Sequence, residues 1–367
     1  MLCSQTNRAF LLLFFIYVEV ELVVSHLYPI RLEASLHETI WGGRTLERDG
    51  WKQLPGGDVA IGEAWETEVT TIVQNGAYAG KTLSKLVDEW GTSLLGEQAT
   101  AIFGPRFPLL AKFIDANANL SVQVHPEDTY AAEREGGKLG KTEFWYILAA
   151  EPGAKIVYGF AHDTHRDAVQ RAIEQVRLEE LLHEEPIFAG DVVFVPAGTV
   201  HAICCGVMLY ELQEYSDVTY RMYDYGRLTA SGKPRELHIE QSLNVSQYNA
   251  AQHVKAKPVA LAGGPEYEER CLVACRYFVT RELLLKEGAS VQRSTPGSCV
   301  ILSSLGAEIH VSYGNAFAHS EVLSRGQTMI LPAALGEYRI TGNGALLLSY
   351  VPAADDAAWA AWQNMNT

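Results

Sequence analysis

Short apolar runs, rich in Val, Ile, Leu, Phe and Tyr, recur along the chain and are separated by Gly, Pro and Asp turns. Runs of this length and composition are typical of β-strands. They predict strands at 120–125, 144–149, 155–158, 191–195, 207–213, 298–302, 309–312, 328–331 and 345–350. Because strands do not alternate regularly with helices, the chain is predicted to be mainly β, a sandwich or barrel with helical decoration, and not a βαβ repeat.

Two segments carry apolar residues at helical spacing. Residues 82–90 place Leu83, Leu86 and Val87 on one face, and residues 164–183 carry a longer apolar stripe that includes Ile173 and Val176. Both patterns predict amphipathic helices. The opposite faces are charged and read as solvated, so neither helix is expected to take part in chemistry.

A faint internal repeat indicates two related halves. The segment from Gly190 to Pro196 resembles the segment from Gly326 to Pro332, since in both a Gly turn leads into an apolar strand that ends at Pro. Five residues beyond the first Pro stands His201, and the equivalent position of the second copy is Glu337. We therefore expect a metal-binding domain at 27–255, with helical insertions, and a metal-free domain at 256–367.

The first 26 residues form an apolar extension of uncertain status. Its longest apolar run, residues 9–18, is shorter than the roughly 20 residues that a membrane span needs. Glu19 and Glu21 interrupt the stretch where a signal peptide would stay apolar. A signal, an inert extension and an upstream start codon all remain open, and no membrane partner is expected.

Charge and cysteine usage narrow the range of partners. The net charge of -15 argues against a nucleic-acid partner, because a phosphate backbone is bound by surplus Lys and Arg. A small anionic substrate is compatible with it, since a few cations inside a cleft suffice. The six cysteines include no CxxC pair, which suits a reducing compartment better than a disulfide framework.

Four residues have the types and spacing of a metal site. Gln123 and His125 are two apart on a predicted strand, so their side chains share one face. Glu143 opens the next strong strand, and His201 follows a Pro-Ala-Gly turn. Two imidazoles, a carboxylate and an amide oxygen would accept Zn²⁺, and also Mn²⁺, Fe²⁺ or Co²⁺.

The motifs resemble a known family. Residues 190–201 read G-x5-P-x-G-x2-H, which is similar to the second metal motif of the cupin superfamily. Gln-x-His, then Gly-Lys-Thr-Glu, then Pro-Ala-Gly-Thr-x-His resembles type I phosphomannose isomerase in its short bacterial form. The resemblance begins near Tyr28, covers nearly the whole remaining chain, and includes the segments 28–32, 40–44, 61–66, 107–115 and 216–227.

This resemblance implies the fold, the cofactor and the reaction. It implies two cupin-type (jelly-roll) β-barrels, the second of them degenerate, and one Zn²⁺ per chain. It implies an aldose–ketose isomerase that interconverts mannose 6-phosphate and fructose 6-phosphate through a cis-enediol. The expected partner is therefore a small sugar phosphate, the expected location is cytoplasmic, and the expected assembly is a monomer or a homodimer.

Further residues are expected around the metal. Lys141 lies close to Glu143 in sequence and is a candidate acid/base or enediolate stabiliser. Arg221 matches a family position associated with the chemistry, and Asp217 is expected to orient it or to bind substrate. Ser121 and Lys112 are expected to contact the substrate.

Two other functions remain open on sequence grounds. A different metal-dependent cupin enzyme, such as a dioxygenase, would also use His and Glu ligands, although Gln123 and Lys141 suit it poorly. A non-catalytic sugar-binding cupin is the second alternative. It would have no need for a complete ligand set with cations beside it.

Overall fold

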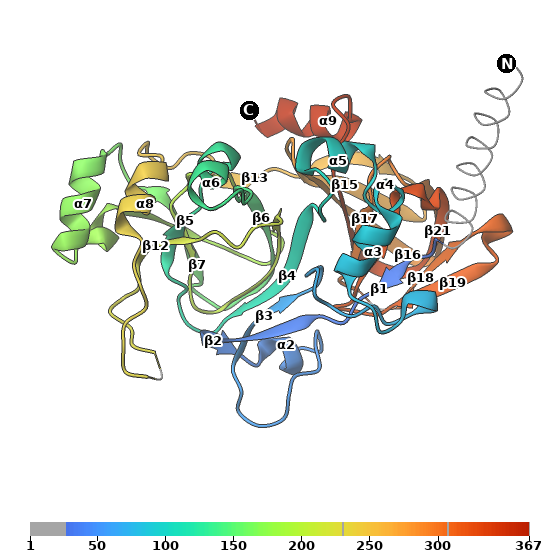
Figure 1. Ribbon diagram of the computed structural model, residues 1–367, viewed down its shortest axis with the longest axis horizontal. Coiled ribbons are helices and arrows are strands. Elements are labelled where there is room, and N and C mark those ends of the chain that lie inside the picture. Colours follow the sequence, from blue (N-terminus) through green and yellow to red (C-terminus); the bar gives the residue numbers. More distant parts are fainter. Residues whose placement is uncertain (1–26, 230, 307, 367) are drawn as a thin grey trace, which may run out of the picture.

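The computed structural model describes residues 27–229, 231–306 and 308–366, and most of its regular elements are strands (Figure 1). The strands form three sheets. A seven-stranded sheet has the order β13 (Lys255–Ala256), β9 (Val192–Val195), β6 (Glu143–Ala150), β11 (Val207–Glu214), β4 (Leu109–Ala116), β3 (Ile61–Trp65), β2 (Ser35–Gly43). A five-stranded sheet has the order β12 (Tyr220–Tyr223), β5 (Val122–Val124), β10 (His201–Ile203), β7 (Lys155–Phe160), β8 (Leu182–Pro186).

The third sheet has nine strands and is built mostly from the C-terminal part of the chain. Its order is β1 (Ile30–Arg31), β20 (Thr328–Leu331), β17 (Val300–Ser304), β21 (Glu337–Tyr350), β16 (Val279–Ser294), β15 (Tyr267–Ala274), β14 (Val259–Gly263), with β18 (Ile309–Tyr313) and β19 (His319–Leu323) attached through β21. The N-terminal strand β1 pairs with β20, so this sheet draws on both ends of the described chain.

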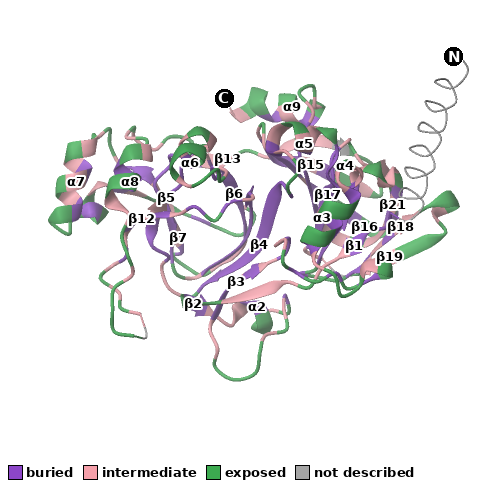
Figure 2. Cartoon of the chain, in the orientation of Figure 1, coloured by how far each residue is buried: buried purple, intermediate pink, exposed green. Residues whose placement is uncertain are grey.

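The first two sheets pack face to face over one apolar core. Ile114, Trp145 and Leu209 of the seven-stranded sheet meet Ile156 and Ile203 of the five-stranded sheet. Figure 2 shows that β4 is buried along its whole length, as expected for a central strand. The prediction of a mainly β, cupin-type fold is confirmed. Within the described residues, none of the three sheets closes on itself by hydrogen bonds.

One of the two predicted helices is confirmed and the other is wrong in extent. Helix α3 (Leu83–Trp90) begins after Thr82, whose hydroxyl accepts the backbone N–H of Lys85. Helix α7 (Arg166–Glu174) ends well before residue 183. Val176 adopts a φ of 55° and is exposed, so the chain turns there and the apolar stripe is broken. The short 3₁₀ helix η2 (Leu178–Leu181) and strand β8 follow.

All but one of the remaining helices have seven residues or fewer. The remaining helices are α2 (Thr45–Arg48), α4 (Thr92–Leu95), α5 (Glu97–Phe103), α6 (Asp128–Arg134), α8 (Ile239–Val245), α9 (Ala357–Asn366) and the 3₁₀ helices η1 (Gly76–Tyr78), η3 (Asn315–Phe317) and η4 (Ala333–Leu335). None of the helices in the described part of the chain is long and apolar enough to span a membrane.

The two predicted halves are closely joined. Figure 1 shows helices α3 to α5 beside the C-terminal strands, and the backbone of Leu95 accepts a hydrogen bond from Cys299. The two repeat segments do form equivalent strands, β9 and β20. The boundary at 255/256 stays a prediction, and the apolar extension at 1–26 lies outside the described residues.

Candidate metal centre and active-site cavity

Three of the four predicted ligands meet at the ends of three strands. His125 directly follows β5, Glu143 opens β6 and His201 opens β10. One ligand atom from each lies within 4.8 Å of the others. All three side chains are at most 1% exposed. Residues far apart in sequence thus form a compact, buried N/O donor set.

Backbone carbonyls orient both imidazoles. The Nδ1 of His125 lies 2.9 Å from the carbonyl oxygen of Val218, and the Nδ1 of His201 lies 2.8 Å from that of Thr199. A ring nitrogen facing a carbonyl must donate, so Nε2 of each ring carries the free lone pair. These Nε2 atoms lie 3.6 and 3.4 Å from the Glu143 carboxylate. Such outer hydrogen bonds are typical of metal-binding histidines.

Gln123 lies beside this triad. It is in register with His201 across the antiparallel pair of β5 and β10, and its amide nitrogen lies 3.5 Å from Nε2 of His201. Its role as a fourth ligand stays a prediction. Gln123 lies near the triad because strand alternation places its side chain on the same face as that of His125.

Lys141 touches two members of the triad. Its Nζ lies 2.7 Å from Oε2 of Glu143 and 3.1 Å from Nε2 of His125. The side chain is buried. A molecule bound at the three predicted ligand atoms would therefore also lie within reach of the Lys141 ammonium.

Burial determines the protonation of the ligands. It lowers the pKa of His201 to about 4, and burial together with the Lys141 ammonium lowers that of His125 well below its usual range. Burial, and then the negative charge of Glu211, raise the pKa of Glu143 to about 7. Both imidazoles are therefore neutral near pH 7, which is the form that binds a metal ion.

The predicted substrate residues line a cavity of about 350 Å³ next to the triad. Its wall includes six of the predicted site residues: Lys112, Ser121, Gln123, Lys141, Asp217 and Arg221. Trp65 and Glu63, which had no predicted role, also line it. The structure thus brings together every residue predicted for the site, with the three buried ligands beneath the wall.

Comparison with known proteins identifies the family. The model of the phosphomannose isomerase type I catalytic domain matches residues 30–150. Mannose-6-phosphate isomerase ManA of Bacillus subtilis is 35% identical over 334 residues, which cover 88% of this chain and 99% of that protein. Mannose-6-phosphate isomerase of Streptococcus mutans is 33% identical, with 88% and 98% covered.

The chain belongs to the type I phosphomannose isomerase family. The crystal structure of the Bacillus subtilis mannose 6-phosphate isomerase superposes with a TM-score of 0.77 at 33% identity, covering 88% of this chain and 99% of that one. The predicted enzyme class, an aldose–ketose isomerase, is confirmed by this membership.

One buried charge of this phosphomannose isomerase site was missed from the sequence. Glu211 of β11 lines the cavity, accepts a hydrogen bond of 2.9 Å from the Trp145 indole and lies 3.2 Å from Nζ of Lys112. Burial would raise the pKa of Glu211, but Lys112 and Lys141 outweigh it and lower that pKa. A charged residue inside the apolar run 207–213 was the available signal.

Lys112 is tied to two carboxylates and an aromatic ring. Its Nζ lies 3.3 Å from Glu63 and 4.8 Å from the centre of the Trp65 ring, in addition to its contact with Glu211. Burial alone would lower the pKa of Lys112, but Glu63 and Glu211 raise it. Lys112 therefore remains a fixed cation in the wall of the cavity.

Arg221 and Asp217 are less closely linked than expected. Nη1 of Arg221 donates to the carbonyl of Glu236 at 2.8 Å, and its Nε is buried without a hydrogen-bond partner. Asp217 instead pairs with Lys138 at 2.7 Å. The expectation that Asp217 orients Arg221 is therefore wrong, whereas its place in the wall of the cavity agrees with a substrate contact.

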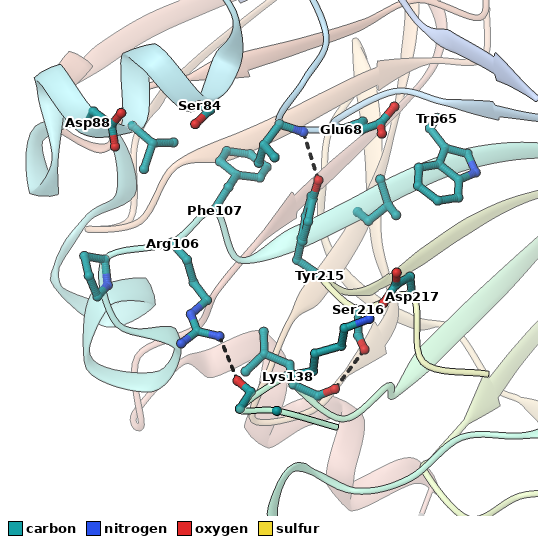
Figure 3. A pocket seen from close by; sticks show the side chains of 17 residues that line it. Trp65, Glu68, Ser84, Asp88, Arg106, Phe107, Lys138, Tyr215, Ser216 and Asp217 are labelled. Carbon is teal, nitrogen blue, oxygen red and sulfur yellow. Dashed lines mark hydrogen bonds and ion pairs between the residues drawn. The ribbon is translucent and has the colours of Figure 1, made fainter. Parts of the chain in front are cut away.

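A second cavity adjoins the first. It has a volume of about 510 Å³ and shares Trp65, Ser216 and Asp217 with the active-site cavity. Figure 3 shows its wall, where Arg106 and Lys138 lie opposite Ser84 and Asp88 of α3. The loop that carries Lys138 leads directly into the Lys141–Glu143 segment.

Proposed function

We propose that this chain interconverts mannose 6-phosphate and fructose 6-phosphate with one divalent metal ion, Zn²⁺, per chain. The observation that carries the proposal is the buried triad of His125, Glu143 and His201 with Lys141 against it, at the edge of a cavity lined by cations and carboxylates. The names of the curated relatives supply the substrate.

The donor set fits a metal ion of this kind. Both rings direct the lone pair of Nε2 toward the buried Glu143 carboxylate, and Nζ of Lys141 lies 3.1 Å from Nε2 of His125 and 2.7 Å from Oε2 of Glu143. Gln123 would complete a set of four. When bound, the metal supplies positive charge to the oxygens of the reacting carbons.

The chain's own residues account for the proton transfer. Isomerisation moves a proton between C2 and C1 through a cis-enediol, which needs an acid/base group and positive charge near the developing oxyanion. Lys141 is placed to exchange a proton or to stabilise the enediolate. The guanidinium of Arg221, with Nε unpartnered, can pair with the same oxygens or with the phosphate.

The remaining residues of the cavity wall bind and orient the sugar phosphate. Ser121 can donate a hydroxyl hydrogen bond to the sugar phosphate, and Lys112 adds a positive charge beside Trp65. Asp217 can accept from a sugar hydroxyl. Because phosphorylated sugars are held inside the cell by their charge, we also propose a cytoplasmic location.

The test combines metal content with turnover. Purified protein should hold about one divalent metal per chain, lose conversion of mannose 6-phosphate with a chelator, and regain it with Zn²⁺. His201→Ala should abolish both metal binding and turnover. His310→Ala is the matched control, since His310 is a partly exposed histidine of the C-terminal sheet that lies 3.0 Å from Glu308. Full activity of His201→Ala would contradict the metal assignment.

A further inference from the structure

The segment 137–143 carries both Lys141 and Glu143, yet it enters a strand only at its last residue. Ahead of β6, contacts from other parts of the chain hold its backbone. Figure 3 shows two of them: Arg106 donates to the carbonyl of Gly137 at 3.5 Å, and the Ser216 hydroxyl donates to that of Leu139 at 2.8 Å.

Asp128 and its neighbours hold the middle of the segment. The N–H of Gly140 donates to Oδ1 of Asp128 at 2.9 Å, and that of Lys141 donates to the carbonyl of Pro126 at 3.0 Å. A Cβ at position 140 would lie 2.5 Å from the backbone nitrogen of Asp128. The segment therefore packs directly against the residues that follow His125, and this contact sets the spacing between His125 and Glu143.

Glu214 holds the next residue, Thr142, through both of its backbone groups. Oε1 of Glu214 accepts the Thr142 N–H at 2.8 Å, and the Glu214 N–H donates to the Thr142 carbonyl at 3.1 Å. Glu214 is 1% exposed. Thr142 lies between Lys141 and Glu143. These two hydrogen bonds therefore fix the backbone from which both side chains project.

The second oxygen of Glu214 indicates its charge state. Oε2 of Glu214 is buried, and it has no hydrogen-bond partner as long as Glu214 and the adjacent Asp128 are both ionised. Burial and the adjacent charge of Asp128 raise the pKa of Glu214 to about 8. Near pH 7 the group is a neutral acid, and its proton can be donated to Asp128, which satisfies the orphaned oxygen.

A side chain next to the nine-stranded sheet contacts Asp128. Tyr277 lies in the turn between β15 and β16, and its hydroxyl donates to Oδ2 of Asp128 at 2.9 Å. Its ring packs against Phe103 of α5, with the ring centres 6.1 Å apart. None of Asp128, Glu214 and Tyr277 lines the active-site cavity.

We propose that Glu214, Asp128 and Tyr277 are positioning residues that fix the Lys141–Glu143 segment, so that the C-terminal sheet contributes to metal affinity and turnover. The expected effects on turnover and on metal affinity rest on the proposed function, whereas the expected effect on the backbone of residues 137–143 does not. The C-terminal sheet then has a role beyond packing, although it carries none of the predicted ligands.

The first test removes only the Tyr277 hydroxyl. Tyr277→Phe should raise the dissociation constant for Co²⁺, followed by its visible absorption, by about three- to tenfold, the value of one hydrogen bond. It should lower kcat with a smaller change in KM. Tyr350→Phe is the matched control, because it also removes a 2.9 Å tyrosine–aspartate hydrogen bond within the C-terminal part. Equal effects of the two variants would overturn the proposal.

The second test uses the neutral form of Glu214. Glu214→Gln keeps an acceptor for Thr142 and a donor for Asp128, so it should match the unmodified protein within about twofold. Glu214→Ala should weaken Co²⁺ binding by about 10–100-fold, as loss of an outer-shell partner does. Unchanged Co²⁺ binding in Glu214→Ala would overturn the proposed role of Glu214.

Hydrogen exchange separates this proposal from the proposed function. In metal-free protein, the amides of 137–143 should exchange faster in Tyr277→Phe and Glu214→Ala than in the Tyr350→Phe control. Unchanged exchange would overturn the positioning role. The expected exchange pattern in a protein without isomerase activity would support the cluster and contradict the proposed function.

Discussion

His201 stands opposite Gln123 across the antiparallel pair of β5 and β10, and the two side chains approach to 3.5 Å. Arg221 is in register with Gln123 from the other side, on β12. Gln123 thus lies at the centre of three adjacent strands that carry an imidazole, an amide and a guanidinium. This register places two of the predicted metal ligands, Gln123 and His201, and the predicted active-site cation Arg221 along one line across the five-stranded sheet.

The position of Gln123 predicts that its loss weakens metal binding without abolishing it. In Gln123→Ala, two imidazoles and the Glu143 carboxylate remain, so we expect metal affinity to fall by about 10–100-fold and turnover to recover at saturating metal. Competition with a chromophoric chelator measures the affinity. Gln74→Ala, at an exposed glutamine, is the control. Unchanged affinity in Gln123→Ala would exclude the amide as a ligand.

Lys141 should affect chemistry and metal binding in opposite directions. Lys141→Met removes the proposed acid/base group, so kcat should fall by about 10²–10⁴. Metal affinity should be unchanged or higher, because a positive charge 3.1 Å from Nε2 of His125 and 2.7 Å from Glu143 is removed.

Steady-state kinetics and metal titration of the same preparation test this separation. Lys155→Met is a suitable control, since Lys155 forms an exposed ion pair with Glu184. A Lys141→Met protein that retained its turnover would show that proton transfer does not use this residue.

Buried and exposed lysines should differ in their contribution to stability. Lys112→Met leaves Glu63 and Glu211 without their shared cation, and loss of one partner of a buried pair costs about 3–5 kcal/mol. Lys138→Met breaks only the exposed pair with Asp217, worth at most about 1 kcal/mol. Urea unfolding of both variants measures the difference. Equal free energies of unfolding would contradict the buried network.

Glu214 predicts a specific dependence of stability on pH. Its pKa rises from 4.5 to about 8 in the folded chain, so between these values the folded state holds a proton that the unfolded state releases. The free energy of unfolding contributed by this group is therefore greatest below pH 4.5 and decreases as the pH rises to about 8.

Glu214→Gln does not titrate and lacks this contribution. From pH 5 to 8 the unmodified protein should lose stability relative to Glu214→Gln, by at most about 1.4 kcal/mol per pH unit, the limit for one proton. Urea unfolding at several pH values follows the difference, in which other titrating groups cancel. Parallel pH profiles for the two proteins would show that Glu214 has an ordinary pKa.

Local patterns were sufficient for the strands that were predicted and for the choice of candidate ligands. Period-two spacing placed Gln123 and His125 on one face, and the Pro-Ala-Gly turn singled out His201, which opens β10 in the structure. Helix α3 was predictable because its apolar face and its Thr82 cap both lie within the segment. Helix α7 was overextended because the apolar residues beyond Glu174 continue the spacing, whereas the chain turns at Val176.

The sequence by itself determined that the chain is mainly β, which residues are the candidate metal ligands and to which family the chain belongs. These depend on short-range spacing and on ordered motifs. Only the tertiary structure decided that Lys141 contacts two of those ligands, that Glu211 is a buried partner of Lys112, and that Tyr277 reaches Asp128 from another sheet. Burial and charge pairing arise between residues distant in the chain, so no local pattern specifies them.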